Sequence, residues 1–415
     1  MSSEIVTGLD VGGTKVCVVV GHILPDKKYP EVIGYGCVPS VGLRKGVVVD
    51  IEETVSAISA ALEAAERMSG VPIDNAVVGV ESATIQSQNS RGVIAVAKSD
   101  GEIASGDINR VIEAARAVSV PANREILHVI PRSYKVDDQD GVHDPVGMTG
   151  VRLEVEAHVV TASTPTIKNL TKCVYQAGLD IDELVLSILA SSKSILNRNQ
   201  MEVGSVAIDI GYSTTGVAVF EEGNVLHTCV LPVGASHVTN DIAIGLRTSI
   251  EVAEKIKITE GCAIPSVIAE RERIDLKKYG VAEGGYVSKR EVAEIIEARM
   301  LEIYGMVNDE LKRIKRDGML PAGVVVTGGG SKLLGVVDLA KESMRLPAQL
   351  GLPINLTGMV EKLNDDPQMV TAIGLMQWAG DILVHGGKST NNTSTKNIQD
   401  GGWGKIKDWL SQFLP

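Results

Sequence analysis

The 415-residue sequence is poor in aromatic residues, with two phenylalanines, three tryptophans and eight tyrosines. It also has only five cysteines, which are isolated from one another and show no CxxC spacing. An odd number of scattered cysteines is typical of reduced thiols in a cytoplasmic protein, so we expect neither a disulfide scaffold nor a zinc site. The five are Cys17, Cys37, Cys173, Cys229 and Cys262.

An excess of positive charge is missing as well. The chain has 40 Lys and Arg against 52 Asp and Glu, a formal net charge of −12. Nucleic-acid binding needs a basic face that neutralises phosphates, so we expect no nucleic-acid partner. No uninterrupted apolar stretch reaches the roughly 18 residues of a membrane-spanning helix. The first residues lack the cationic and apolar regions of a signal peptide, and we expect none.

What the sequence does contain is a regular alternation of strand and helix patterns. Hydrophobic residues make up 44% of the chain, enough for more than one core. Short β-branched runs alternate with helical patterns, which predicts an α/β fold. From about residue 84 to 162 the order changes to strand–helix–strand–strand, which predicts an inserted subdomain. We predict strands at 5–11, 15–21 and 75–80, and helices at 50–70, 107–118, 165–177, 183–196, 288–316 and from Pro367 onward.

An internal repeat is the strongest single pattern. The segment VTGLDVGGTKVCVVVG near the start is matched, almost 200 residues later, by SVAIDIGYSTTGVAVFEEG (205–223). Both place an aspartate and a glycine turn between two apolar strands. Self-similarity of this kind predicts a duplicated architecture.

The two repeated turns carry the residue types that bind phosphate and magnesium. Glycine lets backbone N–H groups approach phosphate oxygens, and an aspartate at a strand end can hold Mg²⁺ through water. Two ordinary hairpins with capping aspartates would look similar, and the pattern alone leaves that alternative open. The candidate residues are Asp10, Gly12, Gly13, Thr14 and Lys15 in the first turn, and Asp209, Gly211, Ser213, Thr214 and Thr215 in the second.

Two further segments fit the same interpretation. VVVTGGGSKL (324–333) places a flat glycine backbone after a strand, where an adenosine can lie above a helix N-terminus. Glu254 and Lys257 are three residues apart on one helical face and can bond to ribose hydroxyls, although such pairs are commonly solvated surface pairs. The glycine-rich candidates are Gly328, Gly329, Gly330 and Ser331.

In this order the motifs resemble those of the actin, heat-shock chaperone and sugar-kinase superfamily. More narrowly, the chain resembles the FtsA family of bacterial cell-division proteins. TNDIAIGL (239–246), AEKIKITEGCA (253–263) and the segment that begins REILHVIPRSYKVD (124–137) carry that resemblance. It covers essentially the whole chain.

The resemblance implies an actin-like fold of two lobes with an inserted subdomain, called 1C. It places subdomain 1A at 1–83 and 163–198, 1C at 84–162, 2A at 199–258 and 318–384, and 2B at 259–317. It also implies ATP with Mg²⁺ held by Asp10 and Asp209, with weak or no hydrolysis. Gly234, Asn240 and Asp241 would join the nucleotide site, and Glu183 would position the attacking water.

The family further implies self-assembly into protofilaments and contacts with other division proteins through 1C. Its tubulin-like partner FtsZ would dock its acidic-apolar C-terminal peptide on 2B. We expect that peptide near Lys289, Arg290 and Arg299, although a solvated basic flank would read the same way.

The last residues predict membrane attachment, which the family resemblance places at the division site. A polar linker (385–402) precedes GGWGKIKDWLSQFLP, and on a helical wheel the large apolar side chains of 403–415 gather on one face. Lysines flank that face, where they can reach lipid phosphates. This predicts a helix lying in the headgroup plane of the membrane, and the resemblance implies the cytoplasmic face. The residues are Trp403, Ile406, Trp409, Leu410, Phe413 and Leu414, with Lys405 and Lys407 at the edges.

Three alternatives share parts of this pattern. LDVGGTK also begins many bacterial glucokinases, but the sugar-binding E-x-G-H motif and the cysteine-rich zinc motif of those enzymes are absent. A chaperone of the heat-shock type would need a peptide-binding β-domain after the nucleotide domain. The actin-like assembly protein of type IV pili shares the fold but lacks the amphipathic ending.

Overall fold

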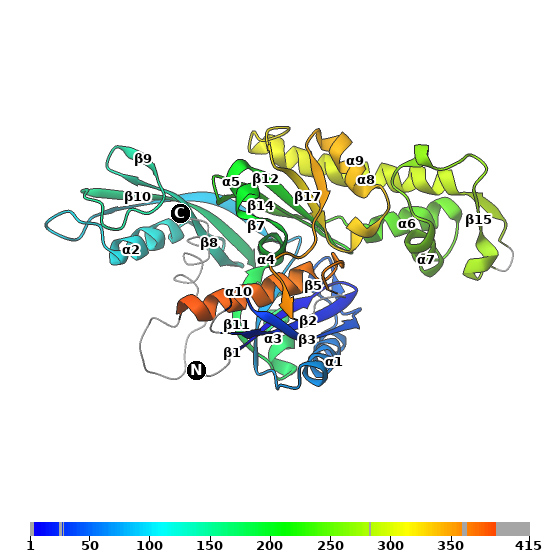
Figure 1. Cartoon of the computed structure of the whole chain (residues 1–415), viewed down its shortest axis with the longest axis horizontal. Coiled ribbons are helices and arrows are strands. Elements are labelled where there is room, and N and C mark those ends of the chain that lie inside the picture. The colour runs from blue at the N-terminus through cyan, green and yellow to red at the C-terminus, as the bar shows by residue number, and fades with distance from the viewer. Residues whose placement is uncertain (1–3, 25–26, 28, 282–283, 359–362, 387–415) are drawn as a thin grey trace.

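The computed structural model describes residues 4–386, apart from 25–26, 28, 282–283 and 359–362. Two α/β lobes lie one above the other in Figure 1, and a cyan unit and a yellow-green unit extend to either side. The predicted linker and membrane helix fall outside the described residues, except that His385 and Gly386 still belong to the last helix. Within the described ranges, none of the helices combines the length and apolarity required to cross a bilayer.

The two main sheets have the same strand topology. In each, three antiparallel strands are followed by two parallel ones: β3-β2-β1-β6-β11 in the first lobe and β14-β13-β12-β17-β18 in the second. The first sheet adds β19 (Thr357–Gly358) at the β3 edge. The duplicated, actin-like architecture is therefore confirmed. The strands are β1 Glu4–Val11, β2 Lys15–Ile23, β3 Glu31–Pro39, β6 Asn75–Val80, β11 Asp180–Leu186, β12 Ser205–Ile210, β13 Thr215–Glu221, β14 Asn224–Leu231, β17 Gly323–Thr327 and β18 Ala348–Leu350.

Helices cover these sheets where the sequence supplies apolar faces and caps. Helix α1 (Ile51–Ser69) begins where the Asp50 side chain accepts a hydrogen bond from the Glu53 backbone N–H, and it ends at Gly70, which has a φ of 73°. Both ends agree with the predicted bounds of 50–70 and show the usual cap and stop of a helix. The other helices and short strands of the lobes are α3 Thr164–Gln176, α4 Ser187–Ile195, α5 Arg198–Val203, α9 Val336–Met344, α10 Val370–Gly386, β4 Leu43–Arg44 and β5 Val47–Val48.

Helices α4 and α10 pack at the junction of the lobes through glycine contacts. A Cβ on Gly374 of α10 would lie 1.9 Å from the Ala190 carbonyl oxygen of α4, so the two helix backbones touch. A Cβ on Gly8 of β1 would lie 2.4 Å from the Ala372 carbonyl oxygen of α10. Only glycine permits approaches this close.

The inserted unit has its own sheet and core. Its strands are ordered β7-β10-β8-β9, and α2 packs on the sheet. Gly92 lets α2 approach, because a Cβ there would lie 2.1 Å from the Val111 carbonyl oxygen. The predicted strand–helix–strand–strand order is found, with the additional short strand β9. The elements are β7 Gln86–Ala95, α2 Ser105–Arg116, β8 Arg124–Val136, β9 Gln139–Val142 and β10 Arg152–Ser163.

The unit at the far end of the second lobe is mainly helical. Its long helix α8 (Lys289–Arg313) is capped by Ser288, whose hydroxyl accepts from the Glu291 backbone N–H at 3.4 Å. Apolar residues of α8 pack toward the second sheet and α6. The remaining elements are α6 Ala235–Leu246, α7 Ile250–Glu260, β15 Arg273–Asp275, β16 Tyr286–Ser288 and the 3₁₀ turns η1 Pro265–Val267, η2 Leu276–Tyr279 and η3 Gly329–Lys332.

The expectation of reduced, isolated cysteines is wrong for two of the five. Cys17 and Cys37 are joined by a disulfide. They face each other in the antiparallel pair β2–β3, with their Cα atoms 4.2 Å apart. Sequence spacing does not show such a pairing, because the register of two strands brings together residues that are 20 positions apart. The free thiols are Cys173, Cys229 and Cys262.

The helix predicted for 183–196 is also wrong in its first part. Residues 180–186 form strand β11, which pairs in parallel with β6, and α4 starts only at Ser187. The run LVL that follows Glu183 is short and apolar, and such a run fits a buried strand as well as a helix. The last helix likewise begins at Val370, three residues after Pro367.

Candidate functional site

A cleft of about 490 Å³ lies between the two lobes. Both repeated turns, the third glycine segment, α7 and the segment that leads into α10 contribute to its walls. Segments far apart in the sequence therefore meet in one place, as the repeat predicts. The predicted site residues that line it are Asp10, Gly12, Gly13, Thr14, Lys15, Asp209, Gly211, Ser213, Thr214, Glu254, Lys257, Gly328, Gly329 and Gly330.

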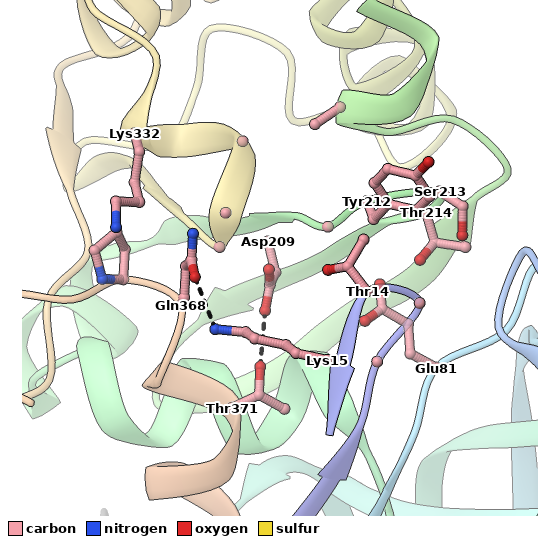
Figure 2. Close-up of a pocket in the computed structure, with 18 of the residues that line it drawn as sticks. Thr14, Lys15, Glu81, Asp209, Tyr212, Ser213, Thr214, Lys332, Gln368 and Thr371 are labelled. Carbon is pink, nitrogen blue, oxygen red and sulfur yellow. Dashed lines mark hydrogen bonds between the residues drawn. The ribbon is translucent and has the colours of Figure 1, made fainter. Parts of the chain in front are cut away.

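The first turn is closed by its own backbone. The Gly12 N–H donates to the Lys15 carbonyl at 2.9 Å, which fixes the link between β1 and β2. The Lys15 ammonium reaches across the cleft to Gln368 Oε1 at 2.9 Å (Figure 2). Burial lowers the pKa of Lys15, while the charge of Asp10 opposes that shift.

The second turn repeats this geometry with different side chains. The Gly211 N–H donates to the Thr214 carbonyl at 2.9 Å. Asp209 Oδ2 accepts from the hydroxyl of Ser191 at 2.8 Å and from that of Thr371 at 3.1 Å, and Figure 2 shows the second of these bonds. These donors come from α4 and α10, so two helices hold the Asp209 carboxylate in position.

Three carboxyl groups converge on the cleft. Asp10 and Asp209 were expected there, and Glu81, the residue directly after β6, joins them. Burial, reinforced by the charge of Asp209, raises the pKa of Asp10 to about 7. Burial also raises the pKa of Asp209, against the hydroxyls of Ser191 and Thr371, and raises that of Glu81 well above its ordinary value.

Sequence reasoning missed Glu81. Figure 2 places its side chain beside the first turn, near Thr14 and Thr214. A single glutamate after a strand has no local signature, but the carboxyl end of a parallel strand in an α/β sheet is the usual place for site residues. That position was the one available signal. Tyr212, Lys332, Gln368 and Thr371 also line the cleft and were not predicted to do so.

The donor set fits a hydrated magnesium ion. Carboxylate oxygens are the ligands Mg²⁺ takes from proteins, usually one or two of them, while it keeps several waters. Glu81 Oε1 is buried and accepts no hydrogen bond from the described residues, so it has a lone pair to offer. A cation here would offset the mutual repulsion of Asp10, Glu81 and Asp209.

The third glycine segment shapes one wall. Gly328 has a φ of 83°, and a Cβ there would lie 2.2 Å from Asp209 Oδ1. A Cβ on Gly330 would lie 2.4 Å from Ile210 Cγ2. Gly329 is different, because its nearest neighbour would be Gln368 Nε2 at 3.6 Å. Gly328 and Gly330 therefore permit close packing, whereas Gly329 leaves room on the cleft side.

Glu254 and Lys257 form a bonded pair on the cleft wall, not a solvated surface pair. The Lys257 ammonium, which is buried, donates to Glu254 Oε2 at 2.6 Å and to the Thr239 hydroxyl at 2.8 Å. Burial lowers the pKa of Lys257, and Glu254 opposes that shift. The fixed pair presents a carboxylate and an ammonium to the cleft.

Six predicted residues lie outside the lining. The Thr215 hydroxyl donates to the Val233 carbonyl at 2.8 Å, and the Ser331 hydroxyl donates to the Gly328 carbonyl at 2.7 Å. Gly234 precedes α6, where a Cβ would lie 2.7 Å from the Gly211 carbonyl oxygen. These residues shape the turns from behind. Asn240 is exposed on α6, Asp241 bonds to Arg299, and Glu183 lies in β11 instead of at the start of a helix.

The three basic residues predicted to receive a partner peptide are engaged in ion pairs. Lys289 contacts Glu260 at 2.9 Å, and Arg290 lies 3.7 Å from Glu270. Arg299 contacts Asp241 at 2.6 Å. The basic charge of this flank is thus balanced within the unit.

Comparisons with known proteins identify two matching family models. The model described as "SHS2 domain inserted in FTSA" matches residues 82–161, and "Cell division protein FtsA" matches residues 206–374. A cell division protein FtsA of Pseudomonas aeruginosa is 41% identical over 377 residues, which are 91% of this chain and 89% of that protein. The Escherichia coli protein of the same name is 32% identical over 415 residues, covering 98% and 97%.

Solved structures show the same fold at low identity. The PilM-PilN type IV pilus biogenesis complex matches with a TM-score of 0.65 and 16% identity, covering 90% of this chain and 98% of that one. MreB5 of Spiroplasma citri bound to ADP matches with a TM-score of 0.52 and 14% identity, covering 89% and 94%.

Proposed function

Because the chain belongs to the FtsA family of cell division proteins, we propose that it binds ATP with Mg²⁺ in the cleft between its lobes and polymerises as an actin-like protein. Family membership disfavours the sugar kinase and the pilus protein as alternatives. The observation that carries the nucleotide proposal is the convergence of Asp10, Glu81 and Asp209 with two glycine turns on one cleft.

Each wall has a distinct task in this proposal. The backbone N–H groups of the two turns bind phosphate oxygens, and Lys15 neutralises their charge. Asp10, Glu81 and Asp209 hold the waters of the Mg²⁺ ion, which would shield the phosphate charge. Glu254 and Lys257 form hydrogen bonds with the ribose hydroxyls, and the open side of Gly329 accommodates the adenosine. The related fold of MreB5 bound to ADP supports this assignment of the cleft.

Glu183 is a weak candidate for positioning an attacking water, because it lies in β11 and outside the cleft lining. Glu81 lines the cleft and is the better-placed carboxylate. Burial and the charges of Asp209 and Asp10 raise its pKa well above the ordinary value, which favours its protonated form. We therefore assign proton handling, where hydrolysis occurs, to Glu81.

The decisive experiment places a side chain where the adenosine is proposed to lie. Gly329→Asp puts a carboxylate on the open side of the glycine wall and should abolish binding of a fluorescent ATP analogue. Gly305→Asp is the matched control, because Gly305 lies in α8 and a Cβ there would have no neighbour within 4 Å. Wild-type affinity in Gly329→Asp would place the nucleotide elsewhere.

The tail carries the membrane part of the proposal. Six large apolar side chains in 403–415 offer about 1.5–3 kcal/mol each on burial. Ordering a residue costs about 1.5 kcal/mol, so a single tail is a marginal anchor and a polymer of many tails a strong one. Trp409→Glu should abolish sedimentation with anionic liposomes and leave ATP binding intact. Undiminished sedimentation of this variant would rule out the anchor.

FtsZ is the proposed partner at the division site, and the inserted unit is proposed to contact neighbouring protomers or other division proteins. Docking of an acidic-apolar FtsZ peptide near Lys289, Arg290 and Arg299 would exchange their intramolecular acid partners for those of the peptide. Fluorescence titration with that peptide tests this, and equal affinity in Arg290→Ala and wild type would move the docking site away from Arg290.

A further inference from the structure

A second polar cluster lies outside the nucleotide cleft, between strand β14 and helix α8. His227 and Cys229 are two residues apart in β14, so their side chains leave the same face of the strand. Glu310 of α8 lies against both. A ring nitrogen of His227, Cys229 Sγ and a carboxylate oxygen of Glu310 all lie within 4.8 Å of one another.

We propose that this β14–α8 cluster is a binding site for a divalent transition metal of the zinc class. Imidazole, thiolate and carboxylate are the three ligand types that zinc takes from proteins, and a thiolate disfavours the hard ions Mg²⁺ and Ca²⁺. Zinc bonds of about 2.0–2.3 Å set tetrahedral ligands roughly 3.3–3.8 Å apart. Because the three donor atoms lie within 4.8 Å of one another, no pair of them needs to approach by more than about 1 Å, with water as the fourth ligand.

The surroundings of the cluster suit a site that fills and empties. His227 Nε2 and Glu310 Oε2 are already 3.0 Å apart, and both side chains are 13% exposed. Arg313 donates to the same oxygen at 3.0 Å, but its side chain is 71% exposed. Arg313 therefore neutralises Glu310 in the metal-free protein and can turn into solvent when a cation replaces it.

One further histidine lies nearby without joining the ligands. The ring centroids of His158 and His227 are 6.3 Å apart. Both nitrogens of His158 are engaged, one with Asn89 at 3.1 Å and the other with Thr228 at 2.9 Å. The proposed site is thus a three-ligand site with an open position.

The position of the cluster gives a bound ion a structural effect. Thr228 lies between the two β14 ligands. Its hydroxyl is hydrogen-bonded to His158 Nε2, and its carbonyl accepts from the Ser87 hydroxyl at 2.7 Å. Ser87 and His158 belong to the inserted unit. A metal that fastens β14 to α8 would therefore stiffen the strand on which the inserted unit rests, independently of nucleotide.

The test uses the full-length protein with excess Mg²⁺ and ATP, so that the carboxylates of the cleft are occupied. Co²⁺ serves as the spectroscopic stand-in for zinc, because a thiolate ligand gives an intense ligand-to-metal absorption band. Wild type should bind one equivalent and show the band. Cys229→Ser should lose the band and bind Zn²⁺ at least about 100-fold more weakly, since even outer contacts to a metal are worth about 10–100-fold.

Cys262→Ser is the matched control and should keep both the band and the affinity. Absence of the band from wild type, or its persistence in Cys229→Ser, would overturn the proposal. The variants are compared after each has shown wild-type circular dichroism and ATP binding, which separates lost ligands from misfolding.

Two charge variants sharpen the assignment. Glu310→Gln should keep the thiolate band but weaken Zn²⁺ binding about ten-fold or more, because one ligand loses its charge. Arg313→Gln should tighten binding several-fold, because it removes the competing cation. Identical affinities in wild type, Glu310→Gln and Arg313→Gln would show that Glu310 is not a ligand and would overturn the three-ligand site.

Discussion

The first and second glycine turns have nearly the same backbone but different side-chain chemistry. In both, the glycine after the strand donates to a carbonyl three residues later, at 2.9 Å in each case. A Cβ on Gly12 would lie 2.9 Å from that oxygen, and a Cβ on Gly211 would lie 3.0 Å from its counterpart. The constraint that requires glycine is thus duplicated along with the strands.

The aspartates of the two turns differ in their hydrogen-bond partners. Asp209 is fixed by the hydroxyls of Ser191 and Thr371. No described side chain donates a hydrogen bond to Asp10, whose nearest compensation is the charge of Lys15. The second lobe therefore supplies a carboxylate that two hydroxyls hold in place. The first lobe supplies a carboxylate without a side-chain donor, together with the cation of Lys15. Duplication preserved the turn, and the side chains around it diverged.

The largest effect expected from the difference between Asp10 and Asp209 is on the free energy of unfolding. The pKa of Asp10 is raised from 3.8 to about 7, so between these pH values the folded protein holds a proton that the unfolded chain releases. Stability contributed at this site therefore falls as pH rises, by up to about 4 kcal/mol. Asp10→Asn should therefore increase the free energy of unfolding more at pH 8 than at pH 4.

Urea denaturation at both pH values, without nucleotide, measures that difference. Added Mg²⁺ and ATP should flatten the pH dependence of the wild type, because a cation stabilises the charged carboxylate. If Asp10→Asn changed the unfolding free energy equally at pH 4 and pH 8, Asp10 would not be the group whose pKa is raised by folding.

A smaller effect is expected on Mg²⁺-dependent nucleotide affinity. Asp209→Asn should weaken it about 100-fold, because the amide removes a fixed charge that the hydroxyls of Ser191 and Thr371 hold in place. Asp10→Asn should weaken it only about ten-fold, because much of Asp10 is already protonated near pH 7. Fluorescent-nucleotide titration with and without Mg²⁺ measures both.

Asp241→Asn is the control for this comparison, since Asp241 pairs with Arg299 outside the cleft lining. Its affinity should stay within about two-fold of wild type. Equal losses in Asp10→Asn and Asp209→Asn would remove the proposed asymmetry between the turns.

The smallest expected effect comes from one hydrogen bond. Ser191→Ala removes a donor to Asp209 Oδ2, and hydrogen bonds to charged groups contribute about 1.5–3 kcal/mol. Because Thr371 still donates, we expect nucleotide affinity to fall by about ten-fold. Ser192→Ala is the matched control, since the Ser192 hydroxyl donates only to the Ile188 carbonyl within the helix. If Ser191→Ala matches this control, Asp209 is positioned by other contacts.

The parts of the site that could be predicted from the sequence are those with a local signature. Asp10, Asp209 and Gly329 stand in short patterns in which the residue and its turn are adjacent. Glu81 reaches the cleft only because β6 ends beside β1, and Cys17 meets Cys37 only through strand register. Both depend on contacts between segments that no single window contains.

Competition between local patterns explains the remaining errors. The run LVL after Glu183 fits helix and strand equally, and the parallel neighbour β6 decides for strand. Glu254 and Lys257 have the spacing of a solvated pair, and tertiary packing against Thr239 buries the lysine. In each case the outcome depends on what packs against the segment.

The two hydrogen bonds that Asp209 accepts also connect its strand to two helices. Its strand belongs to the second lobe, while Ser191 and Thr371 stand on α4 and α10, whose backbones touch at Ala190 and Gly374. This one carboxylate is therefore bonded to both helices beside the place where their backbones touch. Helix α10 runs from this junction to Gly386, directly before the segment that leads to the tail. Asp209 lines the cleft and is bonded to Thr371 in the first turn of α10, so the site and the last described helix share this carboxylate.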